Sequence, residues 1–366
     1  MSAISKFGLF PATMIIILSV GLVNHVFIVP LLLNTALRDS WMCAFISLFL
    51  GLIWALFPVY GTMKRMNEPF TVFLDRALTP WGAWFIKGPL ILLLFFITCN
   101  TFFDTISWAT STYLVHTPYW AITIVFILLV LYTIFSGLRT IAFTSAILLP
   151  FVIVLGDFVM TANLPHKDYT YLLPMFENGV EPVIKGGFLA ACSMGELYTL
   201  VLFQHHLKSR FKLKHVLIIV VLLGLLTLGP LTGAVTQFGP FEAAKLRYPA
   251  FSQWRLVEIG KYIEHVDFFA IYQWLSGAFI RISLSMYLIM ELLPFKKPVI
   301  TKSTMGGIGV IIVVLTQIAC DRMILYRQWV KPFFIYSGAL ILIISLIVWI
   351  ASIIMQRKEA LSRAGS

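Results

Sequence analysis

Long apolar runs recur along the whole chain and are separated by short polar connections. A run of about 20 apolar residues, rising about 1.5 Å per residue as an α-helix, crosses the roughly 30 Å hydrocarbon core of a bilayer. The pattern predicts about ten such helices, at residues 8–32, 40–61, 82–113, 118–136, 140–161, 182–204, 216–238, 266–293, 303–320 and 332–355. We therefore expect an all-α integral membrane protein, with a single transmembrane domain over residues 1–366.

Basic residues are distributed unevenly between the two sides that this succession of helices defines. One side collects Lys64, Arg65, Arg76, Lys87, Lys208, Arg210, Lys212, Lys214, Lys296, Lys297, Lys302, Arg357, Lys358 and Arg363. The opposite short connections are poorer in Lys and Arg. Because cytoplasmic loops carry the excess of these residues, an even number of spans predicts a multi-pass protein of the cell membrane with both termini in the cytoplasm.

The long connection at residues 239–265 is the exception, because it places Lys245 and Arg247 on the side predicted to be outside. Long loops carry little topological information. After Pro249 the connection mixes apolar and charged residues, a pattern that predicts a short amphipathic helix. These residues are Phe251, Trp254, Val257 and Ile259, together with Arg255, Glu258 and Lys261. We expect this helix to pack on the protein like a lid rather than to anchor in lipid.

Composition excludes several classes of protein. Hydrophobic residues make up 60% of the chain and charged residues 12%, whereas a soluble domain is roughly 25% charged, so water is not the main solvent. The net charge of +11 is spread over the connections and forms no patch with interleaved aromatic residues, which argues against nucleic-acid binding. The sequence contains no nucleophile elbow, zinc-protease motif or P-loop. Neither an enzyme nor a bound cofactor is expected.

Three histidines, His205, His206 and His215, lie in one of the basic connections. Metal sites of proteins combine histidine with cysteine or with acidic residues. No such partner stands near these histidines in the sequence, so we do not expect a metal site.

Two predicted spans contain a helix-weakening group near the middle. These groups are Gly21-Leu22-Val23-Asn24-His25 in the first span and Ser193-Met194-Gly195-Glu196 in the sixth. The two spans correspond if the chain consists of two halves of five helices. A discontinuous helix frees backbone N–H and C=O groups inside the membrane, where they can bind a substrate or a cation. The alternative is that the glycines only permit close helix packing.

Polar and ionisable residues within the predicted spans are candidates for a functional site, because a charge in hydrocarbon costs at least about 2.5 to 3.5 kcal/mol on insertion scales. They are Asn100, Thr101, Asp104, Asp157, Glu196, Arg281, Ser283 and Ser285. Glu196 directly follows the second break and could hold a proton or cation, or could form a buried ion pair with Arg281; both alternatives remain open. Asp104 and Asp157 lie nearer the ends of their spans, where we expect interfacial water to solvate them.

Several short motifs follow one another along essentially the whole chain. They are Asp39-Ser40-Trp41, Leu173-Pro174 followed by Gly179, Pro182 and Lys185-Gly186, then Gly195-Glu196, Phe238-Gly239, Tyr248-Pro249, Ile263-Glu264-His265-Val266-Asp267 and Trp274. Each motif is weakly specific, but the ordered set resembles the B-subunit family of nutrient germinant receptors in endospore-forming bacteria.

This resemblance implies the LeuT-type fold of the amino-acid/polyamine/organocation (APC) superfamily. In that fold two inverted repeats of five helices, here about 8–161 and 182–355, have broken helices one and six and a ligand site between helices one, three, six and eight. The implied role is to sense a small nutrient, often an amino acid. The implied partners are a larger membrane A subunit and a lipoprotein C subunit, in the inner membrane of the dormant spore.

The sequence matches the family at Gly195 and Glu196 and departs from it at two places. In the first helix, Val23-Asn24-His25 stands where relatives tend to have small residues, and the glycine is Gly21. In the outer connection His265 replaces the usual arginine. The first departure bears on the shape of the ligand site, so the ligand cannot be transferred from the family.

Three hypotheses follow. The leading one is a nutrient sensor whose ligand contacts are Gly21, Asn24, Asn100, Thr101, Ser193, Gly195 and Ser285, with the charged residues Glu196, Arg281 and Asp104 beside them. The second is an amino-acid or amine symporter that uses Glu196 as its proton or cation site. The third is a scaffold subunit with a degenerate pocket.

Overall fold

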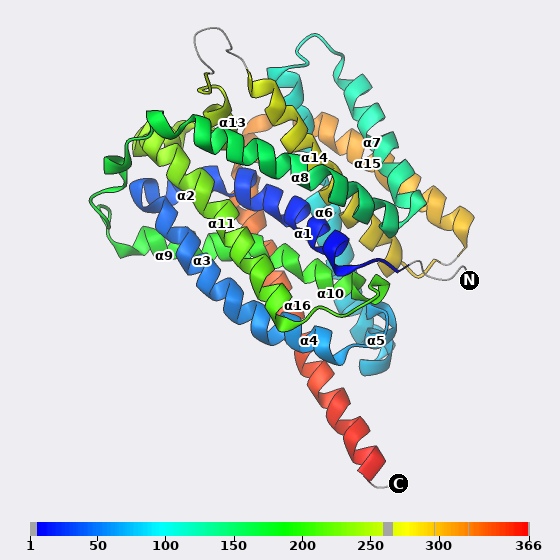
Figure 1. Ribbon diagram of the computed structural model, residues 1–366. Helices are drawn as coiled ribbons and strands as arrows, with labels where there is room; N and C mark the ends of the chain where they lie inside the picture. Colours follow the sequence, from blue (N-terminus) through cyan, green and yellow to red (C-terminus); the bar gives the residue numbers. More distant parts are fainter. Residues whose placement is uncertain (1–5, 259–265, 296, 321, 365–366) are drawn as a thin grey trace.

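The computed structural model describes residues 6–258, 266–295, 297–320 and 322–364, and in this part of the chain the regular structure is helical (Figure 1). The exception is one isolated β-bridge between Phe7 and Leu207. Six residues named above lie outside the described residues: Ile259, Lys261, Ile263, Glu264, His265 and Lys296.

Nine helical runs in the described residues are long and apolar enough to cross a membrane. The first run, Leu9–Arg65, has 57 residues. It would measure about 85 Å if it were straight, almost three times the hydrocarbon thickness of about 30 Å. It turns back instead at the 3-10 segment η2 (Leu37–Asp39), where Leu37 has a φ of 48°. The runs therefore provide ten membrane-length stretches, close to the predicted number and positions.

The first stretch consists of α1 (Leu9–Leu22), the π-helical η1 (Val23–Phe27) and α2 (Val29–Ala36), and the second of α3 (Ser40–Trp54), η3 (Ala55–Val59) and α4 (Tyr60–Arg65). The short α5 (Phe70–Ala77) precedes the third to fifth stretches, α6 (Pro80–Thr112), α7 (Tyr119–Ser136) and α8 (Leu138–Ala162). The sixth stretch contains α9 (Val180–Met194), the 3-10 turn η6 (Gly195–Tyr198), α10 (Thr199–Phe203) and η7 (Gln204–His206). The remaining four are α11 (Leu213–Phe238), α14 (Phe269–Leu292) after η8 (Val266–Phe268), α15 (Pro298–Cys320) and α16 (Met323–Ala364).

The tenth stretch is longer than the apolar pattern predicts. The pattern indicates residues 332–355, whereas α16 begins at Met323 and continues to Ala364. Its polar end contacts α4 and α5: Arg65 Nε donates to Gln356 Oε1 at 2.9 Å, and Arg76 lies 3.5 Å from Glu359. Beyond these contacts α16 projects from the bundle (Figure 1).

The ten stretches divide into a buried centre and a lipid-facing periphery. In the apolar windows of Leu9–Arg65 and Val180–His206, 83% of the residues are buried, against 22% in α8 and in α15. The exposed residues of the peripheral helices are large and apolar, such as Phe151 and Val310. Because such surfaces are stable only in contact with hydrocarbon, the chain is a multi-pass membrane protein.

Close helix contacts in the centre depend on glycine. A Cβ atom added to Gly186 or Gly187 of α9 would lie 2.5 Å from Cys43 or Ile46 of α3. Likewise, a Cβ atom added to Gly338 of α16 would lie 2.4 Å from the Cβ atom of Cys192. These positions leave no room for a side chain and fix where α9 crosses its two neighbours.

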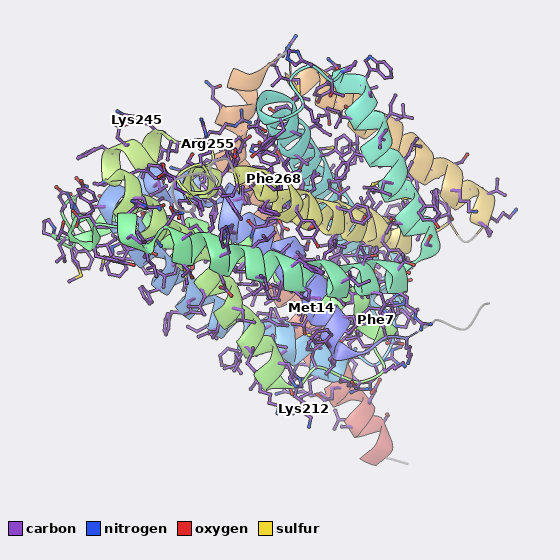
Figure 2. The ribbon with its side chains drawn as sticks, turned by 45° about the horizontal axis from the view of Figure 1, so that its top comes forward. Phe7, Met14, Lys212, Lys245, Arg255 and Phe268 are labelled. Atoms are coloured by element: carbon purple, nitrogen blue, oxygen red, sulfur yellow. The ribbon has the colours of Figure 1, made fainter. Side chains whose placement is uncertain are left out.

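One end of the bundle holds both termini of the described chain together with the basic connections. Phe7 N–H donates to the carbonyl of His206 at 3.1 Å, and Lys208 N–H donates to the carbonyl of Phe7 at 2.9 Å. Figure 2 shows Phe7 and Lys212 toward this end and Lys245 and Arg255 toward the other. Both termini lie on one side, as an even number of crossings requires.

The other end carries the long connections. Arg38 Nε lies 2.6 Å from Glu177 Oε2, which joins the turn after α2 to the loop before α9. The Tyr113 hydroxyl donates to the carbonyl oxygen of Asp267 at 2.8 Å and to its carboxylate at 2.9 Å. Burial and the Asp267 carboxylate raise the pKa of Tyr113, so its hydroxyl remains a donor.

The connection after α11 folds over this end as α12 (Pro240–Lys245) and α13 (Pro249–Trp254). Trp254 is buried and its Nε1 donates to Gln273 of α14 at 2.8 Å. The side chain of Asn163, which follows α8, donates to the carbonyl of Gln253 at 2.9 Å. The helix is shorter than the pattern from Phe251 to Lys261 predicts, and its apolar face packs on protein.

Candidate functional site

The first and sixth stretches depart from α-helical geometry at the two predicted places. In the first, residues Val23–Phe27 form a π-helical turn, with Ile28 N–H donating to the carbonyl of Val23 at 3.0 Å. In the sixth, Gly195–Tyr198 form a 3-10 turn. The predicted breaks are thus changes of helix type within a continuous helical backbone. Such turns are frequent at functional sites.

Asn24 joins the π-helical turn to Ser193, which lies two residues before the 3-10 turn. Asn24 Nδ2 donates to the carbonyl of Leu223 in α11 at 3.2 Å, and its Oδ1 accepts from Ser193 Oγ at 3.0 Å. Both side chains are buried. These two predicted ligand residues therefore contact one another and link the first, sixth and seventh stretches.

Arg281 of α14 lies at the centre of a second polar cluster. Its Nε donates to Glu196 Oε2 at 2.9 Å and its Nη2 donates to Glu196 Oε1. Its Nη1 donates to Thr101 Oγ1. The guanidinium carbon lies 5.6 Å from the ring centroid of Phe27, within cation–π range. Four stretches, the first, third, sixth and eighth, meet at this side chain.

The cluster is charge-balanced and almost completely shielded from solvent. Arg281 is 1% exposed and Glu196 7% exposed. The two-pronged contact confirms the ion pair that was one of the two alternatives for Glu196, and it engages both carboxylate oxygens. A guanidinium has five N–H donors, of which these bonds use three. The group therefore retains donors for a further acceptor.

A small cavity adjoins this cluster. It is lined mostly by Leu and Ile side chains of α6, α10 and α16, together with Gly195, Glu196 and Tyr198, and measures about 10 Å³, about the volume of one water-sized probe. A Cβ atom added to Gly195 would lie 3.2 Å from Ile341 Cδ1. The space is too small for a nutrient-sized molecule unless these helices separate.

Three other predicted ligand residues stand apart from the Arg281 cluster. Gly21 faces α11, where an added Cβ atom would lie 3.0 Å from Leu226 Cδ1. Asn100 Nδ2 donates to the carbonyl of Phe96 in its own helix at 3.0 Å. Ser285 is buried one turn beyond Arg281. Among the described residues, no hydrogen bond joins Asn100 or Ser285 to the cluster.

The prediction that water solvates Asp104 is wrong. Asp104 is 8% exposed, and its carboxylate accepts from Tyr326 of α16 at 2.7 Å, from Arg247 at 3.1 Å and from Tyr248 at 3.2 Å. The connection after α11 folds over this end of α6 and covers the carboxylate, which its place near the end of the span does not indicate. The same contact explains Arg247, a basic residue on the side poor in positive charge.

Aromatic side chains connect this outer network to the Arg281 cluster. Trp274 stacks on Trp108 with 4.4 Å between ring centroids, and it forms a T-shaped contact with Tyr248 at 4.9 Å. It forms a second T-shaped contact with Phe27 at 6.0 Å. No pattern in the sequence indicates a role for Phe27, Trp108 or Tyr326, because only the fold brings them together.

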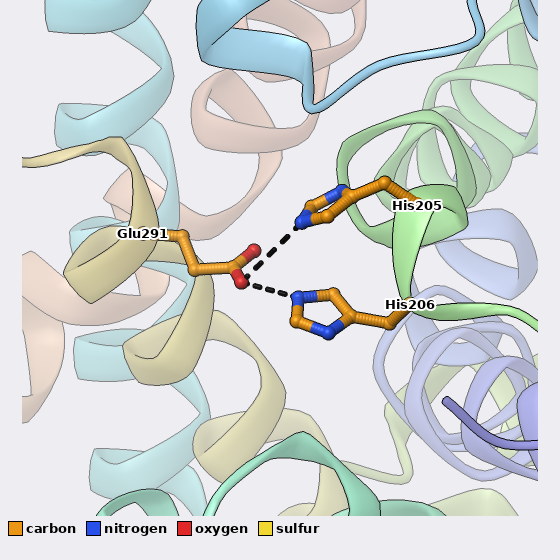
Figure 3. Close-up of side chains that lie close together, drawn as sticks. All are labelled: His205, His206 and Glu291. Carbon is orange, nitrogen blue, oxygen red and sulfur yellow. Dashed lines mark hydrogen bonds and ion pairs between the residues drawn. The ribbon is translucent and has the colours of Figure 1, made fainter. Parts of the chain in front are cut away.

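His205 and His206 do have an acidic partner, contrary to the sequence analysis. Glu291, near the end of α14, contacts His206 Nε2 through its Oε1 atom, and His205 Nε2 lies 3.6 Å from the same oxygen (Figure 3). The partner is 85 residues away in the sequence, so inspection of the connection could not reveal it. His215 instead accepts from Lys212 N–H at 3.1 Å.

Comparison with known proteins identifies relatives over most of the chain. A model of the family described as spore germination protein matches residues 3–325. Spore germination protein XB of Bacillus anthracis is 41% identical over 290 residues, which cover 79% of this chain and 81% of the relative. Putative spore germination protein YfkT of Bacillus subtilis (strain 168) is 25% identical over 276 residues, which cover 72% and 73%.

Proposed function

Because the chain belongs to the family of spore germination proteins, we propose that it is the B subunit of a germinant receptor that senses a nutrient by binding it near the middle of the membrane. The family is not known as one of enzymes. The ligand site that we propose lies between the first, third, sixth and eighth stretches, around Arg281.

Arg281 is the single observation that carries this proposal. A guanidinium buried in a membrane protein costs much free energy unless opposite charge and hydrogen-bond acceptors compensate it, and ionisable residues at such positions mark functional sites. Glu196 compensates the charge of Arg281, and among the described residues two of the five N–H donors of Arg281 remain for a further acceptor. Planar guanidinium donors suit a carboxylate. These features favour a small solute with a carboxylate group, such as an amino acid.

The closed cavity fits a sensor. Binding requires the groups around Gly195, Glu196 and Ile341 to move apart. A ligand shifts the balance of two conformations only as far as its affinities for them differ. A site that admits the ligand in one conformation and excludes it in another meets this condition, because only the first conformation binds the ligand.

The packing of the stretches supports two repeats of five, as the proposed transporter-like fold requires. The first stretch packs on the fifth (α1 with α8), and the sixth packs on the tenth (α9 with α16). The second packs on the sixth (α3 with α9), and the seventh on the first (α11 with α1). The fourth packs on the eighth (α7 with α14), and the ninth on the third (α15 with α6). Adding five to each number, and subtracting ten where the sum exceeds ten, converts one pair into its partner.

The proposed setting is the inner membrane of the spore, with both termini in the cytoplasm. The concentration of basic residues at the end that holds the termini supports this orientation. As a B-subunit homologue, the chain is proposed to assemble with a membrane A subunit and a lipoprotein C subunit, which receive the conformational change.

The test is nutrient-triggered germination of spores whose own copy of the gene is deleted and replaced by a variant. The side chain of Gly195→Trp exceeds the space against Ile341 and would occupy the proposed site, so we expect loss of the response to the nutrients that require this subunit. Gly307→Trp is the matched control, because an added Cβ at Gly307 meets nothing within 4 Å. Membrane levels of both variants are measured by immunoblot. An undiminished response of Gly195→Trp spores would favour the scaffold hypothesis over a binding subunit.

The symporter hypothesis is separated by uptake of nutrient into proteoliposomes. Glu196 is committed to Arg281 through both oxygens, so a proton or cation would have to displace a guanidinium. We expect binding without accumulation of the nutrient. Accumulation driven by a proton or sodium gradient, and abolished in Glu196→Gln, would establish the symporter instead.

A further inference from the structure

A second cluster of potential ligands lies at the end of the bundle that holds the basic connections. His205 and His206 end the sixth stretch, and Glu291 stands near the end of the eighth. The centroids of the two imidazole rings lie 4.1 Å apart, and the Nε2 atom of each ring points toward Glu291 Oε1 (Figure 3). We propose that these three residues bind Zn²⁺ or a similar transition-metal ion, which links the sixth stretch to the eighth.

The donor set selects the class of ion. Two imidazole nitrogens and one carboxylate oxygen suit Zn²⁺ and its neighbours in the first transition row, whereas Mg²⁺ and Ca²⁺ prefer oxygen ligands. Zn²⁺ holds such ligands at about 2.0–2.2 Å, so two of them stand at most about 4.4 Å apart. One ligand atom from each residue already lies within 4.8 Å of the others. Small side-chain rotations complete the geometry.

The hydrogen bonding of His205 is incomplete without an additional partner. Its Nδ1 atom is buried with no hydrogen-bond partner among the described residues. Its Nε2 atom is 3.6 Å from Glu291 Oε1, too far for a hydrogen bond. An ion bound between Nε2 and the carboxylate would give this nitrogen the partner that the 3.6 Å separation denies it.

The surroundings provide what an open zinc site needs. A cavity of about 100 Å³ is lined by His205 and Glu291 together with Pro69, Phe70 and Thr71. It gives room for water at the fourth position of a tetrahedral ion. The Tyr287 hydroxyl, one turn earlier in α14, donates to Glu291 Oε1 at 3.2 Å and orients the carboxylate. Such outer partners are typical of metal sites.

The site would form the second of two connections between the same pair of stretches. Glu196 and His206 are separated by ten residues along the sixth stretch, as are Arg281 and Glu291 along the eighth. At about 1.5 Å per residue, the two connections stand about 15 Å apart. An ion at the second connection therefore favours the conformation in which the Glu196–Arg281 pair is closed.

The experiment uses the untagged full-length protein, purified in detergent and stripped of metal with a chelator. We titrate it with Zn²⁺ alone and measure affinity by competition with a chromophoric chelator. We expect one Zn²⁺ per chain at micromolar concentration, no displacement by excess Mg²⁺, and affinity at least about tenfold weaker in Glu291→Gln. His215→Ala, in the same connection, is the matched control and should bind as the wild type does.

A second variant keeps the test decisive if Glu291→Gln fails to fold. His205 makes no close hydrogen bond through its ring, so His205→Ala should melt at the wild-type temperature without metal and should lose the stabilisation that Zn²⁺ gives to the wild type. Co²⁺ should give visible absorption bands of a four- or five-coordinate site in the wild type only. Absence of Zn²⁺ binding, or equal binding by the wild type and His205→Ala, would show that the cluster is a hydrogen-bonded ion pair and overturn the proposal.

Discussion

Arg281 has almost no exposed surface, and one carboxylate compensates the free-energy cost of burying its charge. A buried ion pair adds little net stability compared with an apolar pair, because both charges lose their hydration. Removing one partner is far more costly, since the other charge remains buried and unpaired. Thr101 contributes a neutral acceptor only. The charge balance of the central cluster thus rests on Glu196.

Glu196→Gln tests this dependence. The amide keeps the shape of the carboxylate but leaves Arg281 without a negative partner, so we expect a loss of about 3–5 kcal/mol of stability, measured as a lower melting temperature in detergent. Glu242→Gln is the control, because Glu242 forms an exposed pair with Lys245. Equal melting temperatures for wild type and Glu196→Gln would mean that the two side chains do not form a charged pair.

Part of this chemistry could be predicted from the sequence. Glu196 and Arg281 stand out because each interrupts an apolar span, and opposite charges buried in a membrane need one another. Phe27 gives no such signal, since an aromatic residue in an apolar helix is ordinary. His206 and Glu291 were also not connected, because nothing in the sequence indicates that the ends of the sixth and eighth stretches meet.

Element boundaries follow the apolar pattern where a polar connection interrupts it. The predicted span 118–136 corresponds to α7 (Tyr119–Ser136), and Gly137, with a φ of 96°, ends it. The pattern fails where a helix leaves the membrane without ending, as in α16. Hydropathy indicates whether a residue lies in lipid or in water, but it does not indicate where a helix ends. A helix that continues from lipid into water keeps its backbone hydrogen bonds in both.

Side-chain contacts with the membrane-length stretches hold the short α12 and α13 against the bundle. Tyr326→Phe removes the 2.7 Å donor to Asp104, so the carboxylate holds Arg247 and Tyr248 less firmly. We expect faster hydrogen exchange over residues 240–258, detected by mass spectrometry, with a change of about tenfold for a loss of about 1.4 kcal/mol.

Tyr336→Phe is the control on the same helix, because Tyr336 is 70% exposed. It should leave exchange in 240–258 unchanged. If both variants exchange at the wild-type rate, the connection is held by its apolar contacts, such as that of Trp254, and not by the Asp104 network.

The two ends of the helix bundle carry different features. One end gathers the termini, the basic connections and the histidine cluster, and the other the long connections with the Asp104 network. The number of crossings and the charge bias could both be predicted from the sequence. The layering of buried and lipid-facing helices could not, because hydropathy does not follow burial: Leu9–Arg65 and Leu213–Phe238 share a mean hydropathy of 2.4 but are 83% and 50% buried.

Single cysteines test this polarity. Lys212→Cys and Lys358→Cys should react with a membrane-impermeant maleimide only after cells are opened, whereas Lys245→Cys should react in intact cells. None of the four native cysteines is exposed, so the wild type gives the background. Labelling of Lys212→Cys and Lys358→Cys from opposite sides would contradict an even number of crossings.

The close approach of Gly338 to Cys192 couples α16 to the turn that carries Glu196. Cys192 lies three residues before Gly195, so a rearrangement of the 3-10 turn would shift α16 at this point. About 27 Å farther along the helix, Gln356 and Glu359 contact Arg65 and Arg76. The helix is therefore a strut between the middle of the sixth stretch and the end of the bundle that carries the termini.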